Sequence, residues 1–278
     1  MKKSLRKFTI AALALIVPAF MAGNAQAIPV DLELALVIDT SGSVSSTEFA
    51  LQINGYAAAF NNVDVQNAIQ TLGDAGTGGI AVGVYFFDTL ASPQINWTQL
   101  VSAADAADFA TALAALTDPT DGWTNIARGM DLGIAGILGN NFEGSRLVMD
   151  VSGDGKQNVN FAGVPSTVST ECSPSKINTS LCYGLVETER DQAAAVGITI
   201  NGLAIIDDFT DLAMYYGDYV ATADGFVFNA TFNTFASAVE QKIFREITTQ
   251  VTQVPEPATL LLMGIGLLGM AMRQRKAA

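Results

Sequence analysis

The chain of 278 residues contains no histidine. Without histidine, neither a Ser-His-Asp nor a Cys-His arrangement can activate a nucleophile, so the usual serine and cysteine hydrolase mechanisms are excluded. A water molecule activated by a bound metal ion remains possible in principle. The sequence therefore leaves a metal-dependent hydrolase as the enzymatic alternative to a binding or structural protein.

Basic residues are scarce, and half of them stand at the two ends of the chain. The sequence has 14 Lys and Arg against 27 Asp and Glu, a formal net charge of −13. The end residues are Lys2, Lys3, Arg6, Lys7, Arg273, Arg275 and Lys276. The body between them holds the other seven basic residues and all 27 acidic ones, so its charge is 7 − 27 = −20. Such a body repels phosphate backbones and attracts divalent cations, which excludes nucleic acid as a partner.

Two loops that carry familiar spacings lack the residues that would complete them. The glycine-rich segment 73–79 is not followed by Lys-Ser or Lys-Thr, so it is a loop and not a phosphate cradle. The run that starts at Asp150 copies the beginning of a helix-loop-helix calcium loop. Its twelfth position is Phe161 instead of glutamate, and a strand instead of a helix precedes it, so this interpretation fails.

Residues 1–27 have the three parts of a secretory signal peptide. A basic start is followed by an apolar run from Phe8 to Val17 and by Ala25-Gln26-Ala27, a small-x-small cleavage site. We expect cleavage after Ala27. The alternative is an uncleaved membrane anchor, which Pro18 and the shortness of the apolar run disfavour.

The sequence has only two cysteines, Cys172 and Cys182. In an exported protein they lie in an oxidising compartment, where we expect them to form a disulfide that closes a short loop. The alternative is a pair of free buried thiols. Their setting among Ser, Pro and Asn, outside any apolar run, argues against that alternative.

Strand-like and helix-like segments alternate along the body. Strands are expected at 34–39, 79–87, around 95–97, 146–151, 198–206 and 226–230, and helices at 46–60, 105–116, 126–138, 185–196 and 235–248. A turn through Ser92-Pro93 leads into the third of these strands, which we expect at an antiparallel edge. The pattern predicts an α/β fold of the doubly wound class, with a mainly parallel sheet and helices on both faces. Ligands of such folds gather at the carboxyl ends of the strands.

Three loops with oxygen-bearing side chains fall at this edge. The first follows the apolar run Leu34-Ala-Leu-Val-Ile and presents Asp39, Ser41 and Ser43. The second presents Thr124 just before a helix, and the third presents Asp154 after a buried strand. Carboxylate and hydroxyl oxygens suit a hard divalent cation. Each residue also has an ordinary interpretation, because Ser, Thr and Asp are common helix caps and turn residues.

With these three loops in this order, residues 30–250 resemble the von Willebrand factor type A domain family, and most closely a bacterial branch whose members mostly lack an assigned function. The resemblance implies a domain at 28–250 and a metal-ion-dependent adhesion site that binds Mg²⁺, Mn²⁺ or Ca²⁺. Its ligands would be Asp39, Ser41, Ser43, Thr124 and Asp154. Because Ser-Gly precedes Asp154, the pattern leaves open whether Asp150 or Ser152 also contributes. The family binds proteins when a partner's carboxylate completes the metal shell.

The C-terminal segment resembles the PEP-CTERM sorting signal of Gram-negative bacteria. A linker at 251–257 contains Pro255-Glu256-Pro257, and a hydrophobic segment with a basic tail follows at 258–278. The apolar span is short for a bilayer crossing, and the basic tail places its end on the cytoplasmic side. The resemblance implies transient anchoring in the inner membrane, processing by an exosortase, and release to the cell surface or exopolysaccharide matrix.

Two functions follow from these resemblances. The first is a metal-dependent adhesion or recognition module, displayed outside the cell and without enzymatic activity. The second is a structural matrix protein whose bound cation only stabilises the fold. The sequence does not separate them, because the carboxylate that would complete the metal site lies in another molecule.

Overall fold

A computed structural model describes residues 27–119, 122–163, 172–173 and 180–249. The expected signal peptide, the linker and the sorting segment lie outside these ranges. Among the helices of the described ranges, none is both long and apolar enough to cross a membrane.

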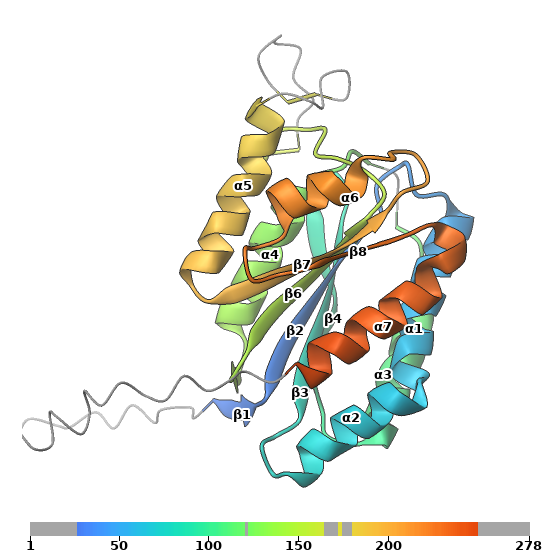
Figure 1. The fold of residues 1–278 in the computed structure, drawn as a ribbon, viewed down its shortest axis with the longest axis vertical. Coiled ribbons are helices and arrows are strands. Elements are labelled where there is room, and N and C mark those ends of the chain that lie inside the picture. The colour runs from blue at the N-terminus through green and yellow to red at the C-terminus, as the bar shows by residue number, and fades with distance from the viewer. Residues whose placement is uncertain (1–26, 120–121, 164–171, 174–179, 250–278) are drawn as a thin grey trace, which may run out of the picture.

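A six-stranded sheet forms the centre of the molecule (Figure 1). Its order is β4-β3-β2-β6-β7-β8. The strands are β2 (Leu32–Asp39), β3 (Ile80–Phe87), β4 (Ala91–Leu100), β6 (Leu147–Gly153), β7 (Ile198–Ile205) and β8 (Val227–Ala230). All neighbours are parallel except β4, which pairs antiparallel with β3 at the edge. A separate short parallel pair joins β1 (Ile28–Val30) to β5 (Phe142–Gly144). The predicted fold class, including the antiparallel edge strand, is confirmed.

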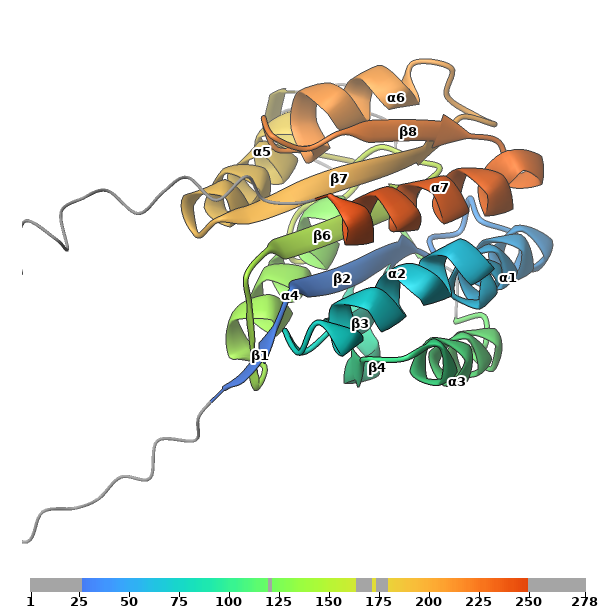
Figure 2. The same cartoon turned by 60° about the horizontal axis from the view of Figure 1, so that its bottom comes forward.

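Helices cover both faces of the sheet, as Figures 1 and 2 show. One face carries α1 (Ser46–Asn61), α2 (Val63–Asp74), α3 (Ala103–Ala114) and α7 (Phe235–Thr248). The other carries α4 (Ile126–Gly139), α5 (Ser180–Ala195) and α6 (Leu212–Tyr215), which continues into a π-helical turn at Tyr216–Val220. A short 3₁₀ helix at Phe232–Thr234 precedes α7.

The central strands are mostly hydrophobic because both of their faces are covered. Every residue of β2 and of β3 is buried. Alternate side chains of β2 enter two separate cores, Leu34 and Leu36 on one face, Ala35 and Val37 on the other. A strand buried on both faces loses the alternation of polar and apolar residues, which is why its sequence is a continuous apolar run.

Glycines let α4 approach the sheet closely. A Cβ atom at Gly129 would lie 2.8 Å from the ring of Phe87, and one at Gly133 would lie 2.8 Å from Met149. A Cβ atom at Gly136 would lie 2.0 Å from the hydroxyl oxygen of Tyr85. Three glycines of this helix therefore pack closely against the sheet. A Cβ at Gly139 would meet nothing within 4 Å.

The structure corrects several predicted elements. The expected turn at Ser92-Pro93 is wrong, because β4 already begins at Ala91 and Pro93 pairs with Tyr85 beside an irregularity in register. Proline has no N–H to donate. An edge strand tolerates it at positions where the N–H of another residue would face solvent and not a partner strand. Helix α5 begins at Ser180, five positions before the expected start. Helix α2 was not predicted, and Asn62 caps it by accepting hydrogen bonds from the backbone N–H groups of Asp64 and Val65.

The predicted disulfide is present. Cys172 and Cys182 are bonded, ten positions apart in the sequence, and both are fully buried. Cys182 lies in the first turn of α5, so the bond ties the start of this helix to the segment that follows β6. The alternative of two free thiols is therefore wrong, although both cysteines are buried as that alternative supposed.

Reduction of this bond should lower the free energy of unfolding by about 2–3 kcal/mol, because the unfolded chain regains the conformations that a short closed loop denies it. Urea denaturation of the exported protein, with and without a reductant, measures the difference. Mass spectrometry of the native material should find the two cysteines linked. Two thiols that alkylate without reduction would contradict the assignment.

Candidate metal site

The polar loops meet where β2 and β6 end, at adjacent positions in the sheet. Asp39 is the last residue of β2, and Asp154 follows β6 directly. Thr124 stands two residues before α4. The loop after β2 is short because Ser45 caps α1, with its side chain accepting from the Glu48 N–H while the Glu48 carboxylate accepts from the Ser45 N–H. These element ends bring all five predicted residues into one place.

A chain of hydrogen bonds connects the side chains of four of them. The hydroxyls of Ser41 and Thr124 lie 3.0 Å apart, and those of Ser41 and Ser43 lie 3.3 Å apart. The Ser43 hydroxyl donates to the Asp154 carboxylate at 2.8 Å. Three hydroxyl oxygens and one carboxylate from three different loops are therefore within contact of one another.

Asp39 completes the group with a buried carboxylate. Its Oδ1 accepts a hydrogen bond from the Ser41 N–H at 2.9 Å, while its Oδ2 is buried and accepts none in the described part of the chain. A Cβ atom at Gly153 would lie 2.6 Å from Oδ2, so glycine is needed there. A buried carboxylate oxygen without a donor is costly unless a proton or a cation balances it.

The two carboxylates hold protons more tightly than ordinary aspartates. Burial raises the pKa of Asp39 well above its usual value, and the negative charge of Asp154 raises it further. Burial also raises the pKa of Asp154 to about 6, and the hydrogen bond from Ser43 only partly opposes this. The charges of Asp208 and Glu48 act in the same direction as burial. The site therefore has a negative environment. It favours binding of a cation, because two ionised carboxylates without a counter-ion are costly there.

Thr124 is positioned from both sides. Its backbone N–H donates to the Asn158 side chain at 2.8 Å, and the Asn158 amide donates back to the Thr124 hydroxyl at 3.2 Å. The interpretation of Thr124 as the helix cap is wrong, because Asn125 caps α4 by accepting from the Arg128 N–H. The Thr124 hydroxyl is thereby left to face Ser41.

Asp150 is turned away from this group. Its carboxylate forms an ion pair of 2.6 Å with Lys242 of α7, and both side chains are fully buried. Lys242 also pairs with Glu246 at 2.6 Å. Ser152 lies on the same face of β6, two positions on, because side chains alternate along a strand. Of the three residues that the sequence left open, Asp154 is the one that contacts the other candidate ligands.

Two further residues border the site and were not predicted. Gln52 of α1 donates from its amide to the Asp39 carbonyl at 3.3 Å. The buried hydroxyl of Tyr216, in the π-helical turn, lies close to Gly153 and has no hydrogen-bond partner among the described residues. Both come from distant segments with no motif of their own, so the sequence offers no signal that would have found them.

The donor set fits a small hard cation. Two carboxylates and three hydroxyls supply oxygen ligands of the kind that Mg²⁺, Mn²⁺ and Ca²⁺ accept. Within the described ranges, no cluster of three or more His, Cys, Asp or Glu side chains could hold a metal ion. A cation bound here would therefore depend on the hydroxyls of Ser41, Ser43 and Thr124 as much as on the two aspartates.

The sequence matches the family described as "Protein of unknown function (DUF1194)" over residues 29–179 and 176–251. The chain belongs to this family. A second match, to the PEP-CTERM protein-sorting motif, covers residues 253–276. No curated protein matches the DUF1194 chain significantly.

Solved structures share the fold. Proximal thread matrix protein 1 from the mussel byssus is 16% identical, with a TM-score of 0.52 over 79% of this chain and 47% of that one. A second structure of that protein is described as having a zinc-occupied MIDAS motif. The vWF domain of the type V pili tip protein Mfa5 from Porphyromonas gingivalis is 15% identical, with a TM-score of 0.51 over 82% of this chain and 99% of that one. This DUF1194 chain spans about half the length of the mussel protein, and its fold is that of a von Willebrand factor type A domain.

Replacing Asp154 by Asn should stabilise the metal-free protein at neutral pH. An acid whose pKa is raised from 3.8 to about 6 on folding favours the folded state while it is protonated, and this contribution is lost as the pH rises from about 4 to about 6. Asn does not ionise, so the variant keeps this contribution as the pH rises. Its free energy of unfolding should exceed that of the unaltered protein by an amount that grows over the same range, to roughly 2–3 kcal/mol above pH 6.

Urea denaturation in EDTA at several pH values measures this difference. The exposed Asp108 of α3 provides the control, since Asp108→Asn should follow the unaltered protein throughout. A constant offset between Asp154→Asn and the unaltered protein, with no dependence on pH, would contradict the assigned cause.

Proposed function

We propose that this protein is an exported recognition module that binds a divalent cation through Asp39, Ser41, Ser43, Thr124 and Asp154. The observation that carries the proposal is the meeting of these side chains at the ends of β2 and β6, where Asp39 presents a buried carboxylate oxygen without a donor. The byssus matrix protein and the pili tip protein that share the fold support this choice of function. We assign the protein no enzymatic activity.

The chemistry of the donor set supports recognition of a partner. Three of the five ligands are neutral hydroxyls, so the protein supplies only two negative charges to a doubly charged ion. A cation bound in this way supplies an electron-poor centre that a further carboxylate can complete. The partner is accordingly a protein or matrix component that presents a carboxylate. Ser43 is exposed at the mouth of the site, whereas Asp39 and Ser41 are buried beneath it.

A structural matrix protein is the second candidate. In that case the cation would offset the burial of Asp39 and Asp154, and no partner would touch it. A matrix protein from the mussel byssus has the same fold and a zinc-occupied site, which is the observation that favours this candidate. The two proposals differ in whether removal of the cation releases a partner or only weakens the fold.

Asp39→Ala should abolish binding of Mg²⁺ or Mn²⁺ in calorimetry, since it removes the deepest carboxylate of the site. Asp108→Ala, an exposed position on α3, should leave binding unchanged. In pull-downs from the native matrix, the unaltered protein should retain a partner only without chelator, and Asp39→Ala should retain none.

Unchanged metal binding by Asp39→Ala would discard the site. Metal binding that depends on Asp39, together with partner capture that ignores the chelator, would favour the structural candidate.

We also propose the division of the chain into a signal peptide at 1–27, a domain at 28–250, a linker at 251–257 and a sorting segment at 258–278. The match to the sorting motif supports processing by an exosortase and display at the surface or in the matrix. Transient anchoring of the precursor in the inner membrane would hold the protein until it is processed. Location matters for function because it limits which partners the cation site can meet.

Replacing Pro255-Glu256-Pro257 by alanines should trap the full-length protein in the inner membrane, because the apolar segment and basic tail remain while the recognised motif is lost. Deleting residues 254–276 should instead release a soluble exported domain. Fractionation with an antibody against the domain separates these outcomes. If the alanine variant reaches the surface at the same size as the unaltered protein, the segment is a plain anchor.

A further inference from the structure

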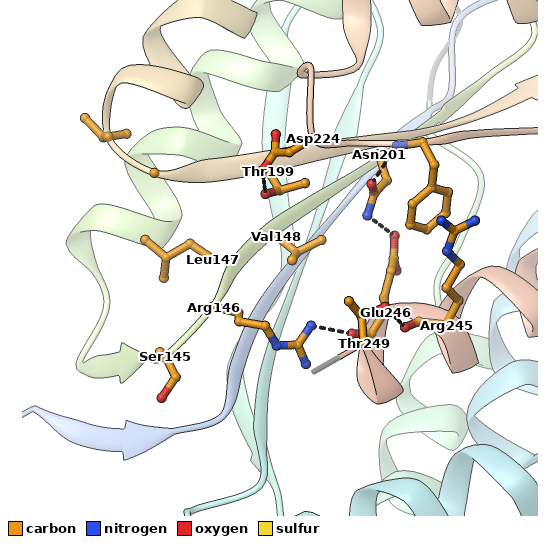
Figure 3. A pocket seen from close by; sticks show the side chains of 14 residues that line it. Ser145, Arg146, Leu147, Val148, Thr199, Asn201, Asp224, Arg245, Glu246 and Thr249 are labelled. Atoms are coloured by element: carbon orange, nitrogen blue, oxygen red, sulfur yellow. Dashed lines mark hydrogen bonds between the residues drawn. The ribbon is translucent and has the colours of Figure 1, made fainter. Parts of the chain in front are cut away.

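A cavity of about 530 Å³ lies at the end of the sheet opposite to the cation site. It is formed where β6 and β7 begin and where α7 ends, so its walls come from segments far apart in the sequence (Figure 3). Arg146 and Arg245 lie on the side near the end of α7, while Thr199 and Asp224 lie together on another side.

The unpaired basic side chains of the described residues all line this cavity. The described ranges hold six Lys and Arg residues, of which four have a carboxylate within 4.0 Å: Arg128, Lys156, Arg190 and Lys242. The two without such a partner are Arg146 and Arg245. In a protein body with 27 acidic residues and seven basic ones, two unpaired guanidinium groups on one cavity are unexpected. They indicate a site for an anion.

Arg245 lines the cavity, and its guanidinium makes no hydrogen bond or ion pair with other residues of the described ranges. Its guanidinium lies 3.9 Å from the centroid of the Phe226 ring. Contact with the ring uses the face of the guanidinium and leaves its edge, which carries the N–H groups, free to bind a carboxylate. Its side chain is exposed, so a ligand can reach it.

Arg146 is a fixed positive charge in the wall. It donates to the Glu246 carbonyl at 2.6 Å and to the Ile247 carbonyl at 3.1 Å, which holds it against the last turn of α7. Burial lowers the pKa of Arg146, because the surroundings solvate its charge less well than water does. A bound anion would offset that loss of solvation, and the rigid setting reduces the entropy lost on binding.

The remaining charges limit the ligand to a single negative charge. Asp224 lines the cavity and accepts from the Thr199 hydroxyl at 2.5 Å. Glu246 also lines it, but Lys242 and Asn201 hold its carboxylate from the inner side. The charges of Asp31 and Glu246 also act on Arg146, and Lys242 is shared between Glu246 and Asp150. Two guanidinium groups among these carboxylates leave at most one net positive charge, which suits a singly charged carboxylate better than a doubly charged phosphate.

The other lining groups suit a ligand rich in hydroxyls. Ser145, Thr199 and Thr249 contribute hydroxyls, whereas Leu147 and Val148 supply a small apolar surface. We propose that this cavity binds a hydroxylated monocarboxylate, the chemistry of a hexuronic acid. This second site is separate from the cation site and does not depend on it.

Calorimetry on the full-length protein tests the proposal, with sodium D-glucuronate as the probe at constant ionic strength in EDTA. Glucuronate should bind, and D-glucose and inorganic phosphate should each bind at least about tenfold more weakly. Arg245→Gln should weaken glucuronate binding by about tenfold, because it removes a charge-assisted hydrogen bond. The matched control is Arg128→Gln, which removes a charge from α4 outside the cavity and should change binding by less than about twofold.

A second variant guards against an effect of Arg245→Gln on the fold. Val196 is 45% exposed at the cavity wall, and Val196→Glu should repel a carboxylate while leaving the core unchanged. The proposal is overturned if glucuronate gives no heat, if both variants bind it as well as the unaltered protein, or if glucose or phosphate binds equally well. Because EDTA removes the cation throughout, none of these outcomes bears on the function proposed for the other site.

Discussion

The positions of the loops depend on the point in the parallel sheet where the strand order reverses. From β2 the chain adds β3 and β4 on one side, and it then returns to place β6, β7 and β8 on the other. The loops after β2 and β6 therefore turn toward opposite faces and leave space between them at the carboxyl end of the sheet. Asp39 and Asp154 occupy the ends of these two strands, so the topology alone brings the two carboxylates together.

Keeping two carboxylates there reduces the stability of the metal-free fold. Both have raised pKa values because burial removes them from water, and no basic side chain of the described residues compensates them. The same protein compensates a buried acid elsewhere, since Lys242 lies 2.6 Å from Asp150 in the middle of β6. The unpaired carboxylates of Asp39 and Asp154 therefore differ from the paired Asp150 in the way that the proposed cation site requires.

The parts of the fold that the sequence predicted are those in which one physical rule acts alone. Apolar runs such as 80–87 predict buried strands because both faces are covered. The prediction failed where the structure of a segment depends on its position in the sheet or on its length. Pro93 suggests a turn but lies in an edge strand that needs no N–H, and the three-residue strands β1 and β5 are too short to show a period.

The candidate site divides in the same way. Its five predicted residues follow directly from motifs at strand ends, and the structure brings them into contact. Whether Thr124 or Asn125 caps α4, and whether Asp150 or Asp154 faces the other candidate ligands, depends on partners such as Asn158 and Lys242 that lie far away in the sequence. The position of Tyr216 beside the site and the cavity that Arg245 lines likewise arise from tertiary contacts.

The two ends of the sheet have opposite electrostatic requirements. β6 has seven residues, which spans about 20 Å at 3.3 Å per residue, so the ends lie beyond the Debye length of about 8 Å at physiological ionic strength. The negative charge of the body as a whole favours a cation at one end and opposes an anion at the other. Anion binding therefore requires local positive charge on side chains that no internal carboxylate contacts directly. Within the described ranges, Arg146 and Arg245 have no carboxylate within 4.0 Å. This lack of a direct ion pair is the physical condition under which the proposed cavity of an acidic protein can hold a carboxylate.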